Sequence, residues 1–181
     1  MKAILSKQTV GVMGSGSNEY NELAREVGDL LAGLDVNLLT GGGRGIMTSV
    51  SRAYTTAPRK CGICLGIIPC SGTHDRSTPK DGYPNEFVEL PIYTHLPFSG
   101  RLGKDDLSRN HINVLSCSAI IALPGGEGTA TEVALAMDYR KPVIAYSPDV
   151  TLVKSFPAAV RRATTLAEVK EFLLKHLGRA A

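Results

Sequence analysis

Three glycine-rich stretches are the part of this sequence best suited to hold a ligand. They read Gly14-Ser-Gly-Ser17, Gly41-Gly-Gly-Arg-Gly45 and Gly125-Gly-Glu-Gly-Thr129. Each stretch follows a short apolar run and precedes a helical pattern, so each is expected to be a strand-to-helix turn that opens a helix. The first N–H groups of a helix lack intrahelical partners and carry partial positive charge. Three such turns at one sheet edge predict a binding site for an anion, above all a phosphate group.

The residues predicted to contact this anion are glycines, small hydroxyl residues and one arginine of the three loops. They are Gly14, Ser15, Gly16, Ser17, Gly42, Gly43, Arg44, Gly45, Gly125, Gly126, Gly128 and Thr129. A long cation such as Arg44 is an unusual choice inside a glycine loop unless it meets an anion, although a role outside the site stays open. The spacing is neither the G-x-G-x-x-G of dinucleotide-binding folds nor the lysine-containing G-x-x-x-x-G-K-[ST] of P-loop enzymes. The sequence therefore argues against both of those classes.

The elements that must position these loops alternate between strand and helix. Strands are expected over residues 10–13, 36–40, 61–68, 87–93, 119–123 and 142–146, and helices over 20–34, 46–55, 105–115, up to 139, and 166–177. The strands are continuous apolar runs, which is typical of a parallel sheet covered on both faces. Pro91 cannot donate to a strand ladder and places its strand near an edge. We therefore predict an α/β, Rossmann-like three-layer αβα sandwich with a mostly parallel sheet, and residues 1–181 as a single domain.

Composition narrows the classes of partner. The chain is 43% hydrophobic, has a formal net charge of +3 and contains no tryptophan. It shows neither the basic stripe nor the stacking aromatics of a nucleic-acid binder. No apolar stretch approaches the length of a membrane span, and the first residues lack the pattern of a signal peptide. We expect a cytoplasmic protein with neither nucleic-acid nor membrane partners. Its polar segment 71–85 is expected to be a mobile cover over the ligand site.

The cysteines and histidines do not form a metal-binding pattern. Cys61 and Cys64 make a C-x-x-C, but they fall in an expected strand, where residues three apart point to opposite faces. His74, His95 and His111 are spread over two loops and a helix without metal-ligand spacing. We predict no metal site.

Two of the glycine stretches carry a family resemblance. Thr40-Gly-Gly-Gly-Arg-Gly-Ile-Met47 and Pro124-Gly-Gly-Glu-Gly-Thr-Ala-Thr-Glu132 resemble the motifs of the lysine decarboxylase-like superfamily. The second stretch matches P-G-G-x-G-T-x-x-E at every fixed position. One branch, of the Lonely Guy type, comprises phosphoribohydrolases that release ribose 5-phosphate from a nucleoside monophosphate. The other branch comprises molybdenum-cofactor carrier proteins, which bind a pterin phosphate without transforming it.

The resemblance adds two residues to the predicted site. The hydrolase branch uses an arginine ahead of the P-G-G motif and the glutamate that ends it, and Arg109 and Glu132 match those positions. If the chain is a hydrolase, the two residues are its catalytic pair, and in either branch Arg109 is expected to bind the ligand phosphate. A guanidinium can clamp a phosphate, and a carboxylate can stabilise an oxocarbenium-like sugar or activate water. The alternative is that the two residues form an ion pair that only orients their helices.

Two departures from the hydrolase pattern favour the carrier branch. Asn110 stands where the hydrolases commonly have a lysine after the arginine, and the first glycine motif is one residue shorter than theirs. The resemblance thus implies the molybdenum cofactor as the bound ligand, with a phosphoribohydrolase as the alternative and a non-catalytic nucleotide-sensing module as a third possibility. Whether the protein is an enzyme stays open. The resemblance also implies a homo-oligomer, a dimer or a tetramer, in agreement with a helix that is apolar on more than one side at Val133, Leu135, Ala136 and Met137.

Overall fold

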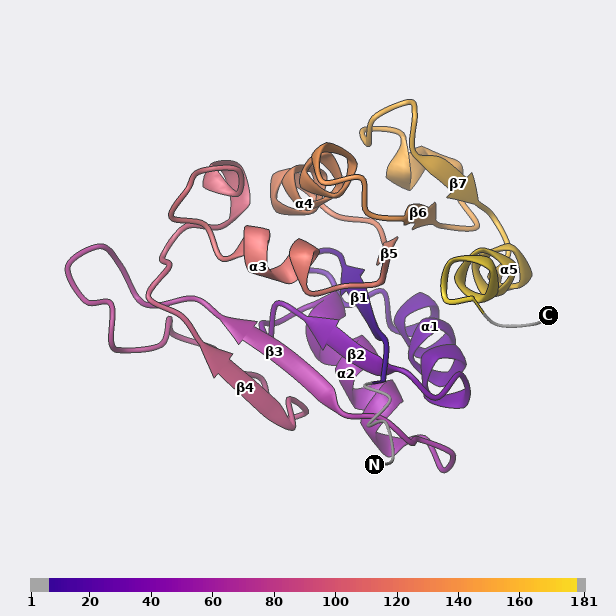
Figure 1. Cartoon of the computed structure of the whole chain (residues 1–181), viewed down its shortest axis with the longest axis horizontal. Helices are drawn as coiled ribbons and strands as arrows, with labels where there is room; N and C mark the ends of the chain where they lie inside the picture. The colour runs from indigo at the N-terminus through magenta and orange to yellow at the C-terminus, as the bar shows by residue number, and fades with distance from the viewer. Residues whose placement is uncertain (1–6, 179–181) are drawn as a thin grey trace, which may run out of the picture.

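The backbone forms one seven-stranded sheet between two layers of helices. The computed structural model describes residues 7–178. The strands are β1 (Thr9–Met13), β2 (Asn37–Thr40), β3 (Cys64–Ile68), β4 (Leu90–Tyr93), β5 (Ala119–Ala122), β6 (Val143–Tyr146) and β7 (Arg161–Ala163). Their order across the sheet is β4-β3-β2-β1-β5-β6-β7, and every neighbouring pair is parallel (Figure 1). The predicted Rossmann-like α/β architecture is confirmed.

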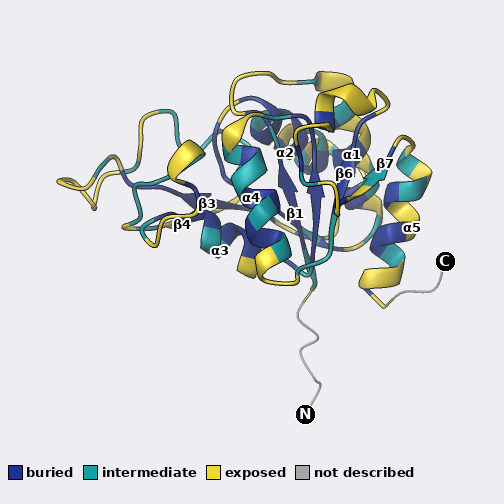
Figure 2. Ribbon diagram, turned by 90° about the horizontal axis from the view of Figure 1, so that it is seen from above, coloured by how far each residue is buried: buried dark blue, intermediate teal, exposed yellow. Residues whose placement is uncertain are grey.

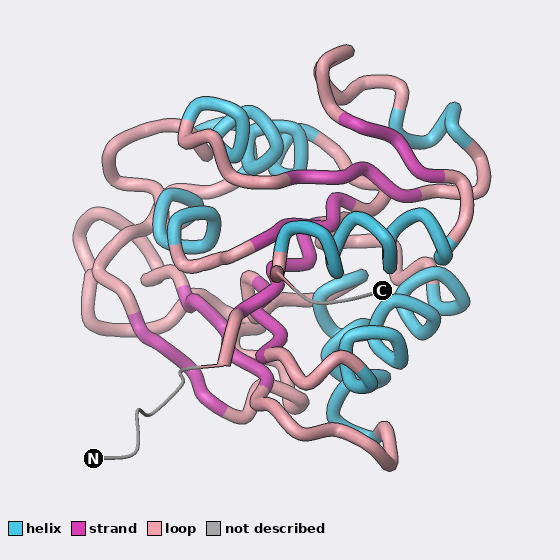
Figure 3. Tube along the Cα trace, turned by 45° about the vertical axis from the view of Figure 1, so that its right-hand side comes forward, coloured by secondary structure: helices cyan, strands magenta, loops and turns pink. Residues whose placement is uncertain are grey.

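Five α-helices cover the two faces of this sheet. They are α1 (Asn21–Gly33), α2 (Ile46–Thr56), α3 (Asn110–Leu115), α4 (Glu127–Asp138) and α5 (Leu166–His176). Two short 3₁₀ helices, η1 (Gly100–Leu102) and η2 (Val150–Val153), lie in the connections. Figure 3 shows the strands running between helices on both sides. Among residues 7–178, no helix combines the length and the apolar character needed to cross a membrane.

Alternation of side chains along the strands places buried apolar clusters on both faces of the sheet. Val10 and Val12 of β1 join a cluster that includes buried residues of α1, α2 and α5. Met13 of the same strand joins the opposite cluster, with Val114 of α3 and Leu135 of α4. Strands buried on both faces are the reason for the continuous apolar runs in the sequence. Figure 2 shows β1 in the middle of the molecule, and all of its residues after Thr9 are buried.

The helices α1 and α2 pack unusually closely. Gly28 of α1 makes this possible, because a Cβ there would lie 2.6 Å from the Cβ of Ala53 and 2.9 Å from the carbonyl oxygen of Val50. The turns that leave β1 and β2 feed these two helices, so their close packing fixes the distance between the first two glycine loops.

The elements differ from those expected in several places; the strand expected over 87–93, for example, begins only at Leu90. The strand expected over 61–68 begins only at Cys64, so that Cys61 is exposed while Cys64 is buried. The helix expected over 105–115 begins only at Asn110, because Asp105 closes a turn instead: its carboxylate accepts from Leu107 N at 2.9 Å and its carbonyl from Ser108 N at 2.8 Å. The strand β7 was not expected, since two of its three residues are arginines. Pro91 does lie in an edge strand, as predicted.

Candidate functional site

A cavity of about 330 Å³ opens at the carboxyl ends of the central strands. It lies where the loops after β1 and β5 diverge, which is the point where the strand order reverses between β1 and β5. Ligands of open parallel sheets bind at such a crevice, and the volume falls within the range of about 300–1,000 Å³ that is usual for small-molecule pockets. Of the residues predicted from the sequence, those that line it are Gly14, Ser15, Gly16, Ser17, Arg109, Gly126, Gly128, Thr129 and Glu132.

The loop after β5 presents open backbone to the cavity. Gly126 precedes the first residue of α4 with extended dihedrals, and a Cβ added to it would meet no atom within 4 Å. Gly128 and Thr129 in the first turn of α4 also line the cavity. The N–H groups of a first helical turn have no intrahelical partners and lie at the positive end of the helix dipole. This end of the cavity can therefore bind an anion through the backbone.

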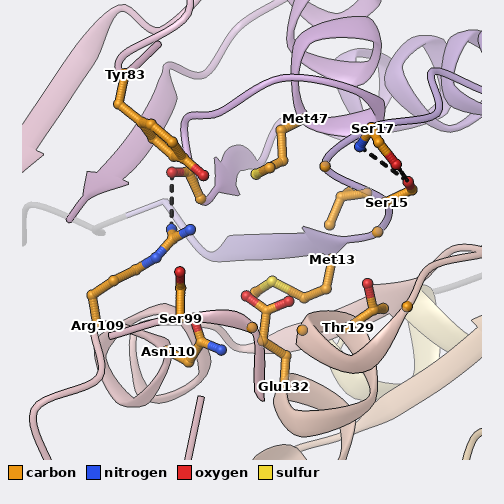
Figure 4. A pocket seen from close by; sticks show the side chains of 17 residues that line it. Met13, Ser15, Ser17, Met47, Tyr83, Ser99, Arg109, Asn110, Thr129 and Glu132 are labelled. Carbon is orange, nitrogen blue, oxygen red and sulfur yellow. Dashed lines mark hydrogen bonds between the residues drawn. The ribbon is translucent and has the colours of Figure 1, made fainter. Parts of the chain in front are cut away.

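The loop after β1 is fastened to the other two loops. Ser15 N donates to the carbonyl oxygen of Pro124 at 3.0 Å, and Ile46 N donates to the carbonyl oxygen of Ser15 at 2.9 Å. The Ser15 hydroxyl accepts from Ser17 N at 3.2 Å and from Asn18 N at 2.9 Å (Figure 4). These bonds occupy N–H groups that the sequence suggested for an anion.

The expectation that each glycine loop opens a helix is therefore wrong for the first one. Helix α1 begins only at Asn21, and the residue before it, Tyr20, has left-handed dihedrals. The first turn of α1 is thus separated from the cavity-lining residues 14–17, whereas the first turn of α4 follows its loop directly.

The loop after β2 lies behind the cavity wall. Gly42, Gly43, Arg44 and Gly45 do not line the cavity, nor does Gly125 of the third loop, whereas Gly41, which was not predicted, does. Gly45 has a φ of 66°, and a Cβ there would collide with the backbone of Ser15. The side chain of Arg44 is 75% exposed and its Nη2 lies 4.0 Å from a carboxylate oxygen of Asp81. The tight turns of this loop thus allow close packing of neighbouring segments.

Arg109 brings a buried positive charge to the cavity edge. The residue immediately precedes α3 and is 4% exposed. Its Nη1 donates to the carbonyl oxygen of Gly41 at 2.9 Å (Figure 4) and to that of Ile67 at 2.8 Å, at the carboxyl ends of β2 and β3. Its Nε is buried without a hydrogen-bond partner among the described residues. The guanidinium is thus fixed in position by the sheet, with donors left over for a ligand.

Glu132 brings a buried carboxyl to the same cavity from α4. The residue is 8% exposed, and its Oε1 accepts from Nδ2 of Asn113 at 3.0 Å. Burial raises the pKa of the Glu132 carboxyl, while the positive charge of Arg109 and the hydrogen bond from Asn113 oppose that rise. Arg109 and Glu132 lie within the described residues and form no direct ion pair. The cavity therefore holds an acid and a cation that are both accessible to a bound molecule.

Several cavity residues lie outside the set of site residues predicted from the sequence. Met13 ends β1 and Met47 lies in the first turn of α2, and both side chains point into the cavity (Figure 4). Tyr83, Ser99 and Asn110 come from the long connections or from the start of α3. A methionine or tyrosine in a connection is recognisable as a cavity residue only once the path of that connection is known. Across residues 7–178, no group of three or more His, Cys, Asp or Glu side chains could hold a metal ion.

Comparison with known proteins places the chain in a family. The model of the SLOG cluster4 family matches residues 7–173, so the chain belongs to this family. A protein of Archaeoglobus fulgidus described only as uncharacterized is 30% identical over 145 residues, 79% of this chain and 82% of that protein.

Solved structures of molybdenum-cofactor proteins resemble the chain over nearly its whole length. The molybdenum cofactor binding protein of the phototrophic bacterium Rippkaea orientalis is 31% identical, with a TM-score of 0.69 and coverage of 96% of this chain and 97% of that one. The molybdenum cofactor carrier protein of Chlamydomonas reinhardtii is 28% identical, with a TM-score of 0.71 and coverage of 96% and 99%. The resemblance to the carrier branch, which Asn110 and the shortened first glycine motif indicate, is confirmed.

Proposed function

We propose that this SLOG cluster4 protein binds and carries a phosphate-bearing small molecule, and that the molecule is the molybdenum cofactor. The observation that carries the proposal is the open N-terminus of α4 at Gly126, which faces the same cavity as the fixed guanidinium of Arg109. The likeness to carrier and binding proteins of this cofactor supports the choice of ligand. Both groups suit the phosphate ester of a pterin.

The cavity residues divide between the two parts of such a ligand. Backbone N–H groups at Gly128 and Thr129, together with the free donors of Arg109, would hold the phosphate. The carboxyl of Glu132 would meet polar atoms of the ring system. The predicted site residues Gly42, Gly43, Gly45 and Gly125 would act through the shape of the wall, because a Cβ at each would collide with neighbouring atoms. The exposed side chain of Arg44 would have no part in this.

The test is to identify the molecule that copurifies under anaerobic conditions. Mass spectrometry of the released ligand, together with elemental analysis for molybdenum, should find a pterin phosphate in the wild type. Gly126→Asp places a negative charge at the open end of α4 and should abolish copurification, because a Cβ fits there but a second anion does not. Gly72→Asp is the matched control, since a Cβ at Gly72 also meets no atom and Gly72 lies outside the cavity. Full ligand loading of Gly126→Asp would contradict the proposal.

A second candidate function is the phosphoribohydrolase reaction. The observation that favours it is the presence of both Arg109 and Glu132 at one cavity, with burial raising the pKa of the Glu132 carboxyl. A hydrolase should release ribose 5-phosphate from AMP, and Glu132→Gln should lower that rate at least about a hundredfold while binding persists. A carrier should release none above background. We favour the carrier because Asn110, whose amide lies 3.4 Å from the Thr131 hydroxyl, replaces the lysine common in the hydrolases.

The oligomeric state and the cellular location complete the proposal. We propose a dimer or tetramer that works in the cytoplasm, built from a single domain over residues 1–181. The apolar sides of α4 are largely explained within the chain, because Val133 and Leu135 pack into two different clusters. Two large hydrophobic residues near α4, Leu115 and Tyr139, stay exposed. Light scattering at micromolar concentration should show an oligomer, and a monomer would contradict this part of the proposal.

A further inference from the structure

The segment after the polar loop 71–79 is fixed against the second glycine loop. Asn85 N donates to the carbonyl oxygen of Gly42 at 2.8 Å, and Asn85 Nδ2 donates to the carbonyl oxygen of Gly43, also at 2.8 Å. The Asn85 Oδ1 accepts from Phe87 N at 3.1 Å, so both the nitrogen and the oxygen of the side-chain amide are hydrogen-bonded. One asparagine thus ties residues 83–88 to the turn that follows β2.

This attachment places one aromatic ring in the cavity wall. The ring of Tyr83 rests on the backbone of Gly43, where a Cβ would lie 2.6 Å from the ring carbon that bears the hydroxyl. Only a glycine at position 43 allows the Tyr83 ring to lie this close to the backbone. Tyr83 is half-buried and lines the cavity, with its hydroxyl end reaching toward the centre of the view in Figure 4.

The ring has a fixed cation beside it. Arg109 Cζ lies 5.8 Å from the centroid of the Tyr83 ring, within the range of a cation–π contact. Because the carbonyl oxygens of Gly41 and Ile67 hold the guanidinium in place, neither partner needs to be ordered when a ligand arrives. Phenol rings and guanidinium planes are both surfaces on which flat heteroaromatic rings stack. The thioether of Met47 adds a polarizable apolar surface to the same cavity.

We infer that Tyr83 is the specificity-determining residue of this cavity, and that with Arg109 it forms a stacking wall for a planar heteroaromatic ring that carries a phosphate. The inference rests on the proposed function, since it needs the phosphate to bind at the N-terminus of α4. The inference goes beyond that function because it assigns the preference for a flat ring to one side chain, Tyr83, in the connection between β3 and β4. On this basis a phosphate ester without a flat ring occupies only half of the site.

The experiment compares two probes, neopterin monophosphate and ribose 5-phosphate, by isothermal titration calorimetry. Neopterin monophosphate has a flat ring and no N-glycosidic bond, so it cannot be hydrolysed as a nucleotide. In Tyr83→Leu the affinity for neopterin monophosphate should fall about tenfold, the size of one ring-on-aromatic contact. The affinity for ribose 5-phosphate should change less than about twofold. Tyr83→Phe should keep the wild-type preference, because it retains the ring.

Controls separate stacking from structural support. Tyr93→Leu removes an exposed tyrosine of the edge strand β4 and should alter neither affinity. Equal losses for both probes in Tyr83→Leu, or no loss for either, would overturn the inference while leaving the phosphate site in place. A wild type that binds neither probe would overturn it together with the proposed function. Thermal unfolding of each variant establishes that the fold is retained before affinities are compared.

Discussion

The loop after β2 has four glycines over residues 41–45 and the loop after β5 has three over 125–129, yet their glycines face different surroundings. A Cβ at Gly43 or Gly45 would collide with a packed side chain or backbone, whereas a Cβ at Gly126 would meet nothing. The loop after β2 is a packing surface on which Ser15 and Tyr83 rest. The loop after β5 opens onto the cavity at Gly126, although a Cβ at Gly125 would collide with the Thr129 side chain. Glycine content therefore marks close approach, and only the surroundings show whether a protein atom or a ligand makes that approach.

The largest effect expected from this contrast is on stability. Gly45→Ala should destabilise the fold by about 2–4 kcal/mol, because Ala disfavours a φ of 66° and its Cβ would collide with the Ser15 carbonyl oxygen. Gly126→Ala should change the free energy of unfolding by no more than about 0.5 kcal/mol, since space and dihedrals both permit a Cβ. Urea unfolding of the two variants measures the difference. Equal costs would remove the distinction between the two loops.

The next effect concerns Arg109, whose guanidinium donates to the carbonyl oxygen of Gly41 in the loop after β2. Arg109→Leu should destabilise the fold by about 1–3 kcal/mol, because the buried carbonyls of Gly41 and Ile67 lose their donor. It should also weaken binding of phosphate ligands, whereas a purely structural arginine would leave binding by the folded variant intact. Chemical unfolding and calorimetric titration give the two values separately.

A smaller effect is expected on the pH dependence of stability, through the Glu132 carboxyl. Since burial raises the pKa of this carboxyl in the folded state, the native protein binds its proton more tightly than the unfolded chain does. The stabilisation from that proton is complete below the unfolded pKa, at about 4.3, and is lost as pH rises through the higher folded pKa. Glu132→Gln should therefore be more stable than the wild type at neutral pH, and the difference should vanish near pH 4. A wild type that gains stability relative to the variant as pH rises would show the opposite sign.

The smallest effect is expected at Arg44. Its exposed side chain lies 4.0 Å from Asp81, and such surface pairs contribute about 0–1 kcal/mol. Arg44→Ala should leave both stability and phosphate affinity nearly unchanged, as measured by unfolding and titration. A large loss of phosphate affinity would show that Arg44, in the loop after β2, contacts the ligand.

The same contrast explains what the sequence could predict. Apolar runs predicted the strands, because burial on both faces requires apolar residues. The P-G-G-x-G-T-x-x-E motif predicted Glu132 and the part of the cavity at the N-terminus of α4. Two features depended on distant partners instead. Gly43 needs its glycine because of Tyr83, and Arg109 finds its partners at Gly41 and Ile67. The strand β7 escaped notice because a short edge strand needs no apolar run.

The central position of β1 has a consequence for the order of events during synthesis. Its neighbour β5 pairs Val10 with Ala119, so the two strands leave the ribosome more than a hundred residues apart. Until β5 docks, β1 presents an unpaired, apolar edge to solvent, a surface that invites association with other chains. The hydrogen bond from Ser15 N to Pro124 forms at the same late step. The nascent chain thus has no complete cavity until its second half has emerged, so a small molecule can bind in the cavity only after that step.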